Sequence, residues 1–320
     1  MIEVRNLSKS YGKVEAVRNV SFSVGKDQVL GFLGPNGAGK TTIMKILTGF
    51  HFPSSGTALV DAIPVDEDPV EIKKRIGYLP ENVPLYGDMT VDEYLAFIAE
   101  ARLIPAGRRK SAIDSCLESC GLGVFRGRKI ETLSKGYRQR AGLAQAIVHD
   151  PPILILDEPT NGLDPNQIIE IRSLIKELGR RKTVILSSHI LQEIEAICSQ
   201  VLIINEGKIA AQGTPEEIAG TMKGGDTWEL TLKGAGAEAV RGRLSLLGEG
   251  ITKIAAESLE DGTVQLGFFV PSGAFESPGE CIFDWAVANN YKILGMSRKK
   301  LSLEDIFVEL TSEEHGYVSK

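Results

Sequence analysis

A glycine-rich segment near the N-terminus carries residues that could bind phosphate groups. Residues 34–42 read GPNGAGKTT and match the pattern GxxxxGK[ST], between a short apolar run and a predicted helix. Glycines let the backbone fold so that successive N–H groups point at phosphate oxygens, and a helix N-terminus adds partial positive charge. Lys40 can reach the β- and γ-phosphates of a nucleotide, and Thr41 can offer its hydroxyl to Mg²⁺. The predicted phosphate site consists of Asn36, Gly37, Ala38, Gly39, Lys40, Thr41 and Thr42.

Two carboxylates follow a run of four apolar residues in the middle of the chain. Ile153–Leu156 has the composition of a parallel strand that is buried on both faces. Asp157 and Glu158 would then lie at the carboxyl edge of the sheet, where α/β proteins bind ligands. We predict that Asp157 holds Mg²⁺ and that Glu158 polarises the water that attacks the γ-phosphate. The alternative, a solvated acidic turn before Pro159, is disfavoured by the glycine-rich loop upstream.

Two further turns flank this strand in the sequence. LSKGYRQR, residues 133–140, places Ser134 where it can cap the N-terminus of a helix. NGLD, residues 161–164, ends in Asp164, which is followed by a proline and by Gln167, as expected for a second capped helix. The first turn is a candidate for a second phosphate-binding segment, because helix N-termini attract anions. Capping alone would also explain the residue types at both turns.

Apolar periodicity predicts the elements that position these residues. Alternating apolar and polar residues predict strands within residues 2–24. The pattern between residues 88 and 149 is helical, and Thr90 with Glu93 forms a candidate capping box. Beyond it, buried strands alternate with helices as far as a hairpin that turns at Glu206–Gly207. The order predicts an α/β fold of the P-loop NTPase type, with an N-terminal antiparallel β subdomain and a helical subdomain.

The last third of the chain has a different pattern. Residues 221–226, TMKGGD, have the composition of a linker. The order that follows is strand, helix, two strands, helix, strand, and a last helix that begins at Ser302, which matches a ferredoxin-like module. We therefore predict a nucleotide-binding domain over 1–220, with its helical subdomain at about 88–149, and a small α+β accessory domain over 221–320.

Composition narrows the possible partners and the compartment. The net charge is −6, which gives no support for a surface that binds nucleic acid. No apolar stretch approaches the ~18–20 residues needed to span a bilayer, and the N-terminus lacks an apolar signal core. We expect a cytoplasmic protein that serves a membrane only through a partner. Paired Cys and His zinc ligands are missing, so we expect free thiols at Cys116, Cys120, Cys198 and Cys281.

Taken together, the motifs resemble those of the ATP-binding-cassette (ABC) ATPases. LSKGYRQR resembles the signature turn of that family, and NGLD resembles its D-loop. His189, after TVILSS, resembles its switch histidine, and Tyr11, in SYGKVEAV, resembles its adenine-stacking aromatic residue. The motifs occur in the family's order over residues 1 to about 215. The nearest comparison is with bacterial export-type ATP-binding subunits of the ABC-2, multidrug and gliding-motility-associated types.

The resemblance implies ATP and Mg²⁺ as cofactors and a head-to-tail dimer of two ATPase subunits, identical or different. In such a dimer Ser134 and the Gly136 N–H would contact the γ-phosphate bound to the other subunit. Asp164 would add an interface role to its capping role, and His189 would sense the γ-phosphate beside the carboxylates. The plainer alternatives are a structural histidine and, for Tyr11, a ring that packs in the N-terminal sheet.

Three positions depart from the family's pattern. Glu81 stands where the family usually has the glutamine that contacts Mg²⁺ and the attacking water, and a glutamate keeps the acceptor oxygen but adds charge. We expect Glu81 to remain a metal ligand that links the nucleotide to the membrane partner. Lys135 replaces the signature glycine that precedes Gly136 and either approaches the partner's nucleotide or points to solvent. Tyr137 replaces the signature's glutamine.

The expected function is that of an ATP-hydrolysing subunit that energises a separate integral-membrane permease, with export as the favoured direction. The protein would then lie at the inner face of the cell membrane, and the stretch 82–105 is the expected docking surface. The alternative is a soluble ABC-type ATPase in translation or DNA repair. Two cassettes in one chain or a long coiled-coil insertion would favour that alternative, and the sequence has neither.

Overall fold

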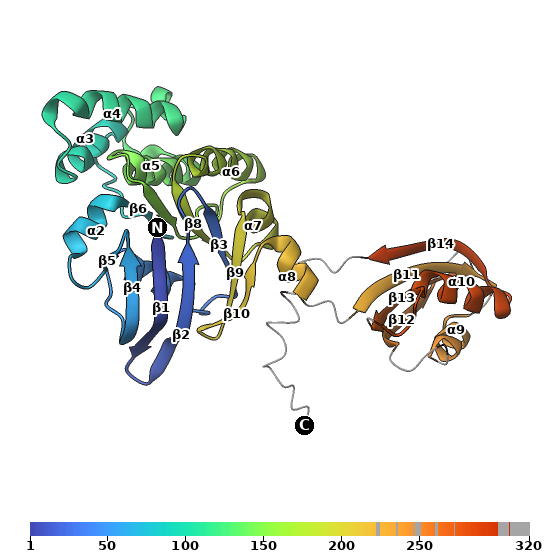
Figure 1. Ribbon diagram of the computed structural model, residues 1–320. Coiled ribbons are helices and arrows are strands. Elements are labelled where there is room, and N and C mark those ends of the chain that lie inside the picture. Colours follow the sequence, from blue (N-terminus) through green and yellow to red (C-terminus); the bar gives the residue numbers. More distant parts are fainter. Residues whose placement is uncertain are drawn as a thin grey trace. The chain divides into compact units, whose positions relative to one another are not determined.

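The computed structural model (Figure 1) divides into two units, residues 1–215 and residues 216–309. It describes residues 1–221, 225–234, 236–245, 247, 251–259, 262–271, 273–299 and 307 of the 320-residue chain. The helix predicted to begin at Ser302 falls outside the described residues. No helix in the described part of the chain is long and apolar enough to cross a membrane.

The first unit is organised around a six-stranded sheet with the order β10-β9-β3-β8-β7-β6. All neighbours pair in parallel except β10, which forms an antiparallel hairpin with β9 at one edge. Every residue of β3, β7 and β8 is buried, as the apolar runs predicted. The strands are β3 (Val29–Leu33), β6 (Ile76–Leu79), β7 (Ile153–Leu156), β8 (Thr183–Ser188), β9 (Gln200–Asn205) and β10 (Lys208–Gly213).

A four-stranded antiparallel sheet with the order β2-β1-β4-β5 forms the predicted N-terminal β subdomain. In β2, Val20, Phe22 and Val24 are buried and alternate with exposed serines, which is the period-two pattern of a sheet with one buried face. The strands are β1 (Ile2–Tyr11), β2 (Val14–Val24), β4 (Ser55–Val60) and β5 (Ile63–Pro64).

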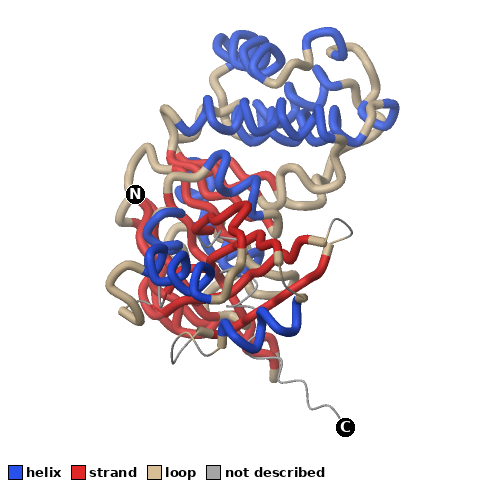
Figure 2. The backbone as a smooth tube through the Cα atoms, turned by 90° about the vertical axis from the view of Figure 1, so that its right-hand side faces the viewer, coloured by secondary structure: helices blue, strands red, loops and turns tan. Residues whose placement is uncertain are grey.

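A helical region connects β6 to β7. In it α3, α4 and α5 pack against one another, and Figure 2 shows a group of helices (blue) at the top of the view, apart from the strands (red). Thr90 and Glu93 form the predicted capping box at the start of α3. The helices and 3₁₀ turns between β5 and β7 are α2 (Pro69–Arg75), α3 (Val91–Ala101), α4 (Ala106–Ser119), η1 (Gly123–Phe125), η2 (Ile130–Thr132) and α5 (Lys135–Ile147). The later helices are α6 (Pro165–Gly179), α7 (Leu191–Ile197) and α8 (Pro215–Thr221).

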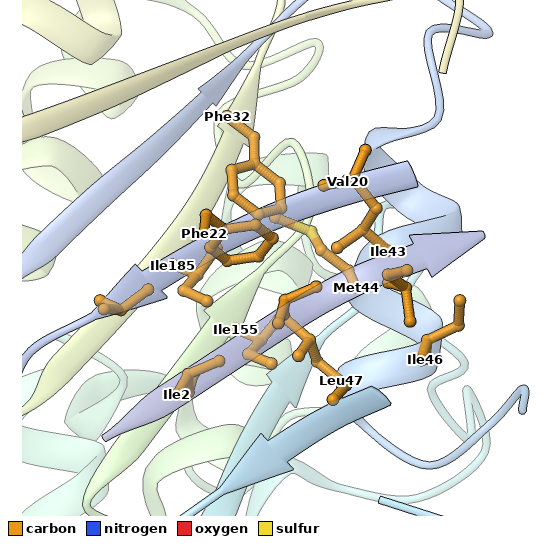
Figure 3. Packing of buried hydrophobic residues seen from close by; sticks show 14 of the residues in the cluster. Ile2, Val20, Phe22, Phe32, Ile43, Met44, Ile46, Leu47, Ile155 and Ile185 are labelled. Atoms are coloured by element: carbon orange, nitrogen blue, oxygen red, sulfur yellow. The ribbon is translucent and has the colours of Figure 1, made fainter. Parts of the chain in front are cut away.

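The core of the first unit joins the two sheets to α1 (Lys40–Leu47), which begins directly after the glycine-rich loop. Figure 3 shows Phe22 of the antiparallel sheet against Phe32 of β3, and the two rings pack edge to face with centroids 5.5 Å apart. Ile155 and Ile185, from the centre of the parallel sheet, and Met44 of α1 belong to the same cluster. The packing holds the start of α1 in place at the end of β3.

The second unit has the strand order β12-β13-β11-β14, and all of its paired neighbours are antiparallel. Together with the chain order this is the ferredoxin-like arrangement. The elements are β11 (Gly225–Lys233), α9 (Ala237–Leu244), β12 (Thr252–Ser258), β13 (Thr263–Pro271), α10 (Pro278–Ala288) and β14 (Lys292–Lys299). Gly225 and Asp226 lie in β11 and not in a linker, because both pair with β13.

The cysteines behave as free thiols. Cys116, Cys120 and Cys198 are buried, Cys281 is partly buried, and none is in a disulfide. Burial raises the pKa of Cys116 to about 12 and that of Cys120 further, so both thiols stay protonated at neutral pH. The described residues contain no group of His, Cys, Asp and Glu side chains that could hold a metal ion by themselves.

His149 lies between α5 and β7 in a cavity of about 1020 Å³ that is bordered by the helical region and by Lys182 before β8. Burial, with a smaller contribution from the charge of Arg102, lowers the pKa of His149 from 6.5 to about 4. The imidazole is therefore neutral in the folded protein at pH 7.

This shift predicts a pH dependence of stability. Between about pH 6.5 and pH 4 the unfolded chain binds a proton at His149 that the folded protein does not. The free energy of unfolding therefore decreases as the pH falls. From the size of the shift, we expect the wild type to lose about 2–3 kcal/mol between pH 7 and pH 4.5 relative to His149→Gln, which cannot titrate. Urea unfolding at both pH values measures the difference. Parallel pH profiles for the two proteins would contradict the assignment.

Candidate active site

The glycine-rich loop follows β3 and ends at the N-terminus of α1, as predicted. Gly37 and Gly39 have φ values of +83° and +107°, a region that favours glycine. A Cβ at Gly39 would lie 2.6 Å from the carbonyl oxygen of Ala16, and one at Gly34 would lie 2.3 Å from that of Ile204. Side chains are therefore excluded at both ends of the loop, where the neighbouring backbone is close.

Lys40 is the first residue of α1 and its side chain is almost fully buried. Its Nζ donates to the carbonyl oxygens of Gly34 at 2.6 Å and Pro35 at 3.2 Å, and lies 3.6 Å from Oε1 of Glu158. Burial lowers the pKa of the Lys40 ammonium, although the charges of nearby carboxylates, led by Glu158, oppose the shift. The buried ammonium group thus depends on these carboxylates as its counter-charges.

Asp157 and Glu158 follow β7 at the carboxyl edge of the sheet, where the sequence placed them. Asp157 is 1% exposed. Its Oδ1 accepts a hydrogen bond from Ser187 Oγ at 2.6 Å, whereas its Oδ2 is buried and has no partner among the described residues. An orphaned buried carboxylate oxygen is costly unless a cation or a donor meets it.

Glu158 has a left-handed backbone, with φ at +47°, which is uncommon for a residue with a side chain and is often found at functional sites. Its N–H donates to Ser187 Oγ at 2.8 Å, and its Oε2 lies 2.9 Å from Nδ1 of His189. One serine therefore supports both carboxylate residues, and the histidine is a direct neighbour of the proposed base. Sequence reasoning missed Ser187, which it treated only as part of the strand before His189.

A cavity of about 490 Å³ brings the loop and the carboxylate together. Glu81 lines it and accepts a hydrogen bond from Nδ2 of Asn161 at 3.1 Å, so Glu81 also contacts the turn that leads to Asp164. The lining residues are Ala16, Asn36, Gly37, Ala38, Gly39, Lys40, Thr41, Thr42, Glu81, Glu158, Asn161 and His189. Asp157 does not line the cavity, and its carboxylate is hydrogen-bonded to Ser187.

The serine-glycine turn does not line that cavity in its own chain, nor does Tyr11. Ser134 caps α5, and its Oγ accepts a long, 3.5 Å hydrogen bond from the N–H of Tyr137. A Cβ at Gly136 would lie 2.2 Å from Oε1 of Gln167, so the turn packs on the start of α6. The Tyr11 ring is 44% exposed and packs against His51 at 5.7 Å.

Lys135 and Tyr137, which differ from the family's signature turn, both contact other segments of the chain. Lys135 is exposed, yet a Cβ at Gly162 would lie only 1.9 Å from its Nζ, so the ammonium rests on the turn between Asn161 and Asp164. Tyr137 packs on Phe125 with ring centroids 4.0 Å apart. Asp164 caps α6, since its Oδ1 accepts from the N–H of Gln167 at 3.0 Å.

Comparison with known proteins adds independent information. A family model described as "ABC transporter" matches residues 17–161. The linearmycin resistance ATP-binding protein of Bacillus subtilis is 31% identical over 314 residues, which are 97% of this chain and 98% of that protein. The Nod factor export ATP-binding protein I of Burkholderia orbicola is 35% identical over 263 residues, or 81% and 84% of the two chains. The first of these matches extends over both units.

Solved structures agree with the first unit. An ATP-binding subunit of an ABC transporter is 28% identical with a TM-score of 0.64, and the match covers 69% of this chain and 92% of that one. A bacterial ABC transporter cassette solved as a dimer is 26% identical with a TM-score of 0.62, and the match covers 67% and 98%. The chain thus shares its fold with ABC ATP-binding cassettes of known structure.

The double contact of Ser187 generates a prediction about stability. Ser187→Ala leaves the buried carboxylate of Asp157 without a hydrogen bond from the described residues and removes the acceptor for the Glu158 N–H. Because hydrogen bonds to buried charges contribute more than neutral ones, we expect the free energy of unfolding to fall by about 2–3 kcal/mol. Ser199→Ala is the matched control, since Ser199 Oγ donates only to the carbonyl oxygen of Val29, at 3.2 Å. Urea unfolding compares them, and equal losses would contradict the assignment.

Proposed function

The chain belongs to the ABC transporter family, and from this premise we propose that it is the ATPase subunit of an exporter. The observation that carries the proposal is the arrangement of Lys40, Glu158 and His189 around the glycine-rich loop in one cavity. ATP hydrolysis in this subunit would drive a separate integral-membrane permease. The relatives named above for linearmycin resistance and for Nod factor export support transport over a role in translation or repair.

The hydrolytic step follows from the positions of these groups. The loop N–H groups and Lys40 bind the β- and γ-phosphates and offset the negative charge that develops on them. A water oxygen attacks the γ-phosphorus while Glu158 accepts its proton. The bond from that phosphorus to the bridging oxygen breaks, and ADP leaves with the electron pair. His189, which is exposed beside Glu158, holds the carboxylate in place and contacts the γ-phosphate.

The residues present fit a magnesium ion. Mg²⁺ prefers oxygen ligands, and the orphaned Oδ2 of Asp157 is an oxygen that needs a cation. We assign Thr41 and Asp157 to hold the ion with the phosphates, and Glu81, which lines the cavity together with Thr41, as a further oxygen donor. When bound, the ion neutralises charge on the β- and γ-phosphates.

The site is proposed to be completed by a second ATPase subunit, identical or different. Ser134 and Gly136 lie at the N-terminus of α5 and outside the cavity of their own chain, so in a head-to-tail dimer they are available to the other subunit's γ-phosphate. Asp164, which caps α6 beside Gln167, would lie at the same interface. The dimeric cassette among the similar structures supports this arrangement. Tyr11, with its exposed ring, is assigned to stack on adenine.

Docking of the permease is proposed at the stretch 82–105, on the cytoplasmic side of the membrane. Tyr86 and Phe97 pack edge to face at 5.6 Å there, and both rings are about half exposed. The 1020 Å³ cavity adjoins the end of the stretch, and its border carries Lys73, Lys74 and Arg108. Exposed aromatic rings on the stretch, together with the cations at the border of the cavity, suit a cytoplasmic permease segment with apolar and acidic side chains.

The first functional prediction concerns the base. Glu158→Gln removes the proton acceptor and keeps the shape, so we expect ATP hydrolysis to fall by about 100-fold or more while an ATP-bound dimer accumulates. Size-exclusion chromatography with ATP and a phosphate-release assay measure both effects. Glu118→Gln, at an exposed position of α4, is the control and should match the wild type. Unchanged hydrolysis in Glu158→Gln would overturn the assignment.

The second functional prediction concerns the coupling of ATP hydrolysis to transport. Glu81 joins the cavity to Asn161, so we expect Glu81→Ala to hydrolyse ATP while transporting less substrate per ATP in vesicles that contain the permease. Glu81→Gln keeps an acceptor oxygen for Asn161 and should retain coupling. Unchanged transport per ATP in Glu81→Ala would rule out a coupling role.

A further inference from the structure

A buried carboxylate next to the site has no role in the account above. Glu193 lies on α7, four residues after His189, and is 2% exposed. Burying a carboxylate costs free energy unless donors surround it. A glutamate in the first turn of a helix often caps that helix, but α7 has no side-chain cap and the carboxylate of Glu193 is bonded elsewhere.

The contacts of Glu193 join two segments that carry catalytic groups. Its Oε2 accepts hydrogen bonds from Thr160 Oγ1 at 2.6 Å and from Ser188 Oγ at 2.8 Å. Its Oε1 lies 3.5 Å from a guanidinium nitrogen of Arg172 on α6. The four side chains come from four different parts of the chain: Thr160 from the segment after β7, Ser188 from the end of β8, Glu193 from α7 and Arg172 from α6.

Both hydroxyl groups are close to the reacting groups along the chain. Thr160 is two residues after Glu158 and directly before Asn161, which bonds to Glu81. Ser188 directly precedes His189, and its Oγ also accepts from the N–H of Ile190 at 3.0 Å. One carboxylate oxygen therefore holds the backbone that carries the base and the backbone that carries the histidine.

We propose that Glu193 is a positioning residue that sets the distance between Glu158 and His189 and fixes both to the turn that begins at Asn161. It does not line the cavity and acts through Thr160 and Ser188. The inference rests on the proposed function, since it assigns a positioning role in the same ATPase site.

The test separates positioning from binding and from folding. In Glu193→Ala we expect kcat for ATP hydrolysis to fall about tenfold or more while KM for ATP changes by less than about threefold, because the phosphate loop is untouched. Glu193→Gln retains an oxygen that can accept both hydroxyls and should keep kcat within a few-fold of the wild type. Glu195→Ala, exposed on the same helix, is the control and should match the wild type.

A mutant cycle makes the inference falsifiable even if Glu193→Ala folds poorly. Thr160→Val and Ser188→Ala should each lower kcat, and their effects in combination should be non-additive because both act through one carboxylate. In the Glu193→Ala background neither should lower kcat further. Additive effects, or a normal kcat in Glu193→Ala, would overturn the inference. Failure of the proposed function is distinguishable, since the wild-type protein would then not hydrolyse ATP at all.

Discussion

The parallel pairing of β7 with β8 is the constraint on which the rest of the site depends. Leu156 lies opposite Leu186 in the register, so the residues that follow each strand emerge side by side at the carboxyl edge of the sheet. Asp157 and Glu158 follow β7, while Ser187 and Ser188 end β8 and His189 follows it. A slip of the register by one residue would turn each of these side chains to the opposite face, so the buried apolar cores of both strands indirectly set the catalytic geometry.

The balance of charge at this edge favours a cation beside the nucleotide. Lys40 is the buried cation, and it faces Glu158 with Asp157 and Glu81 nearby. Three carboxylates against one ammonium leave an excess of negative charge, which Mg²⁺ would offset as the nucleotide enters. The left-handed backbone of Glu158 costs about 1–3 kcal/mol, and the hydrogen bond to Ser187 together with the ion pair to Lys40 opposes that cost.

The parts predicted correctly from sequence are those that depend on local chemistry. The helix N-terminus at Lys40, the caps at Thr90 and Asp164 and the buried strand before Asp157 are each determined by residues within a few positions. The contacts that escaped prediction join distant segments. Glu193 meets Thr160 across 33 residues and has the sequence appearance of a solvated helix glutamate. The packing of Tyr137 on Phe125 likewise depends on how the helical region folds.

The central claim is that each nucleotide site is completed by another subunit, and mixed dimers test it most directly. Lys40→Ala removes the ammonium group that binds phosphate in the variant's own site. Ser134→Ala removes the hydroxyl that the variant offers to the site of its partner. Each variant alone should be inactive in a single-turnover hydrolysis assay. A mixture forms dimers in which one site has both Lys40 and Ser134 intact, so the account predicts that mixing restores hydrolysis. A mixture no more active than either variant alone would contradict it.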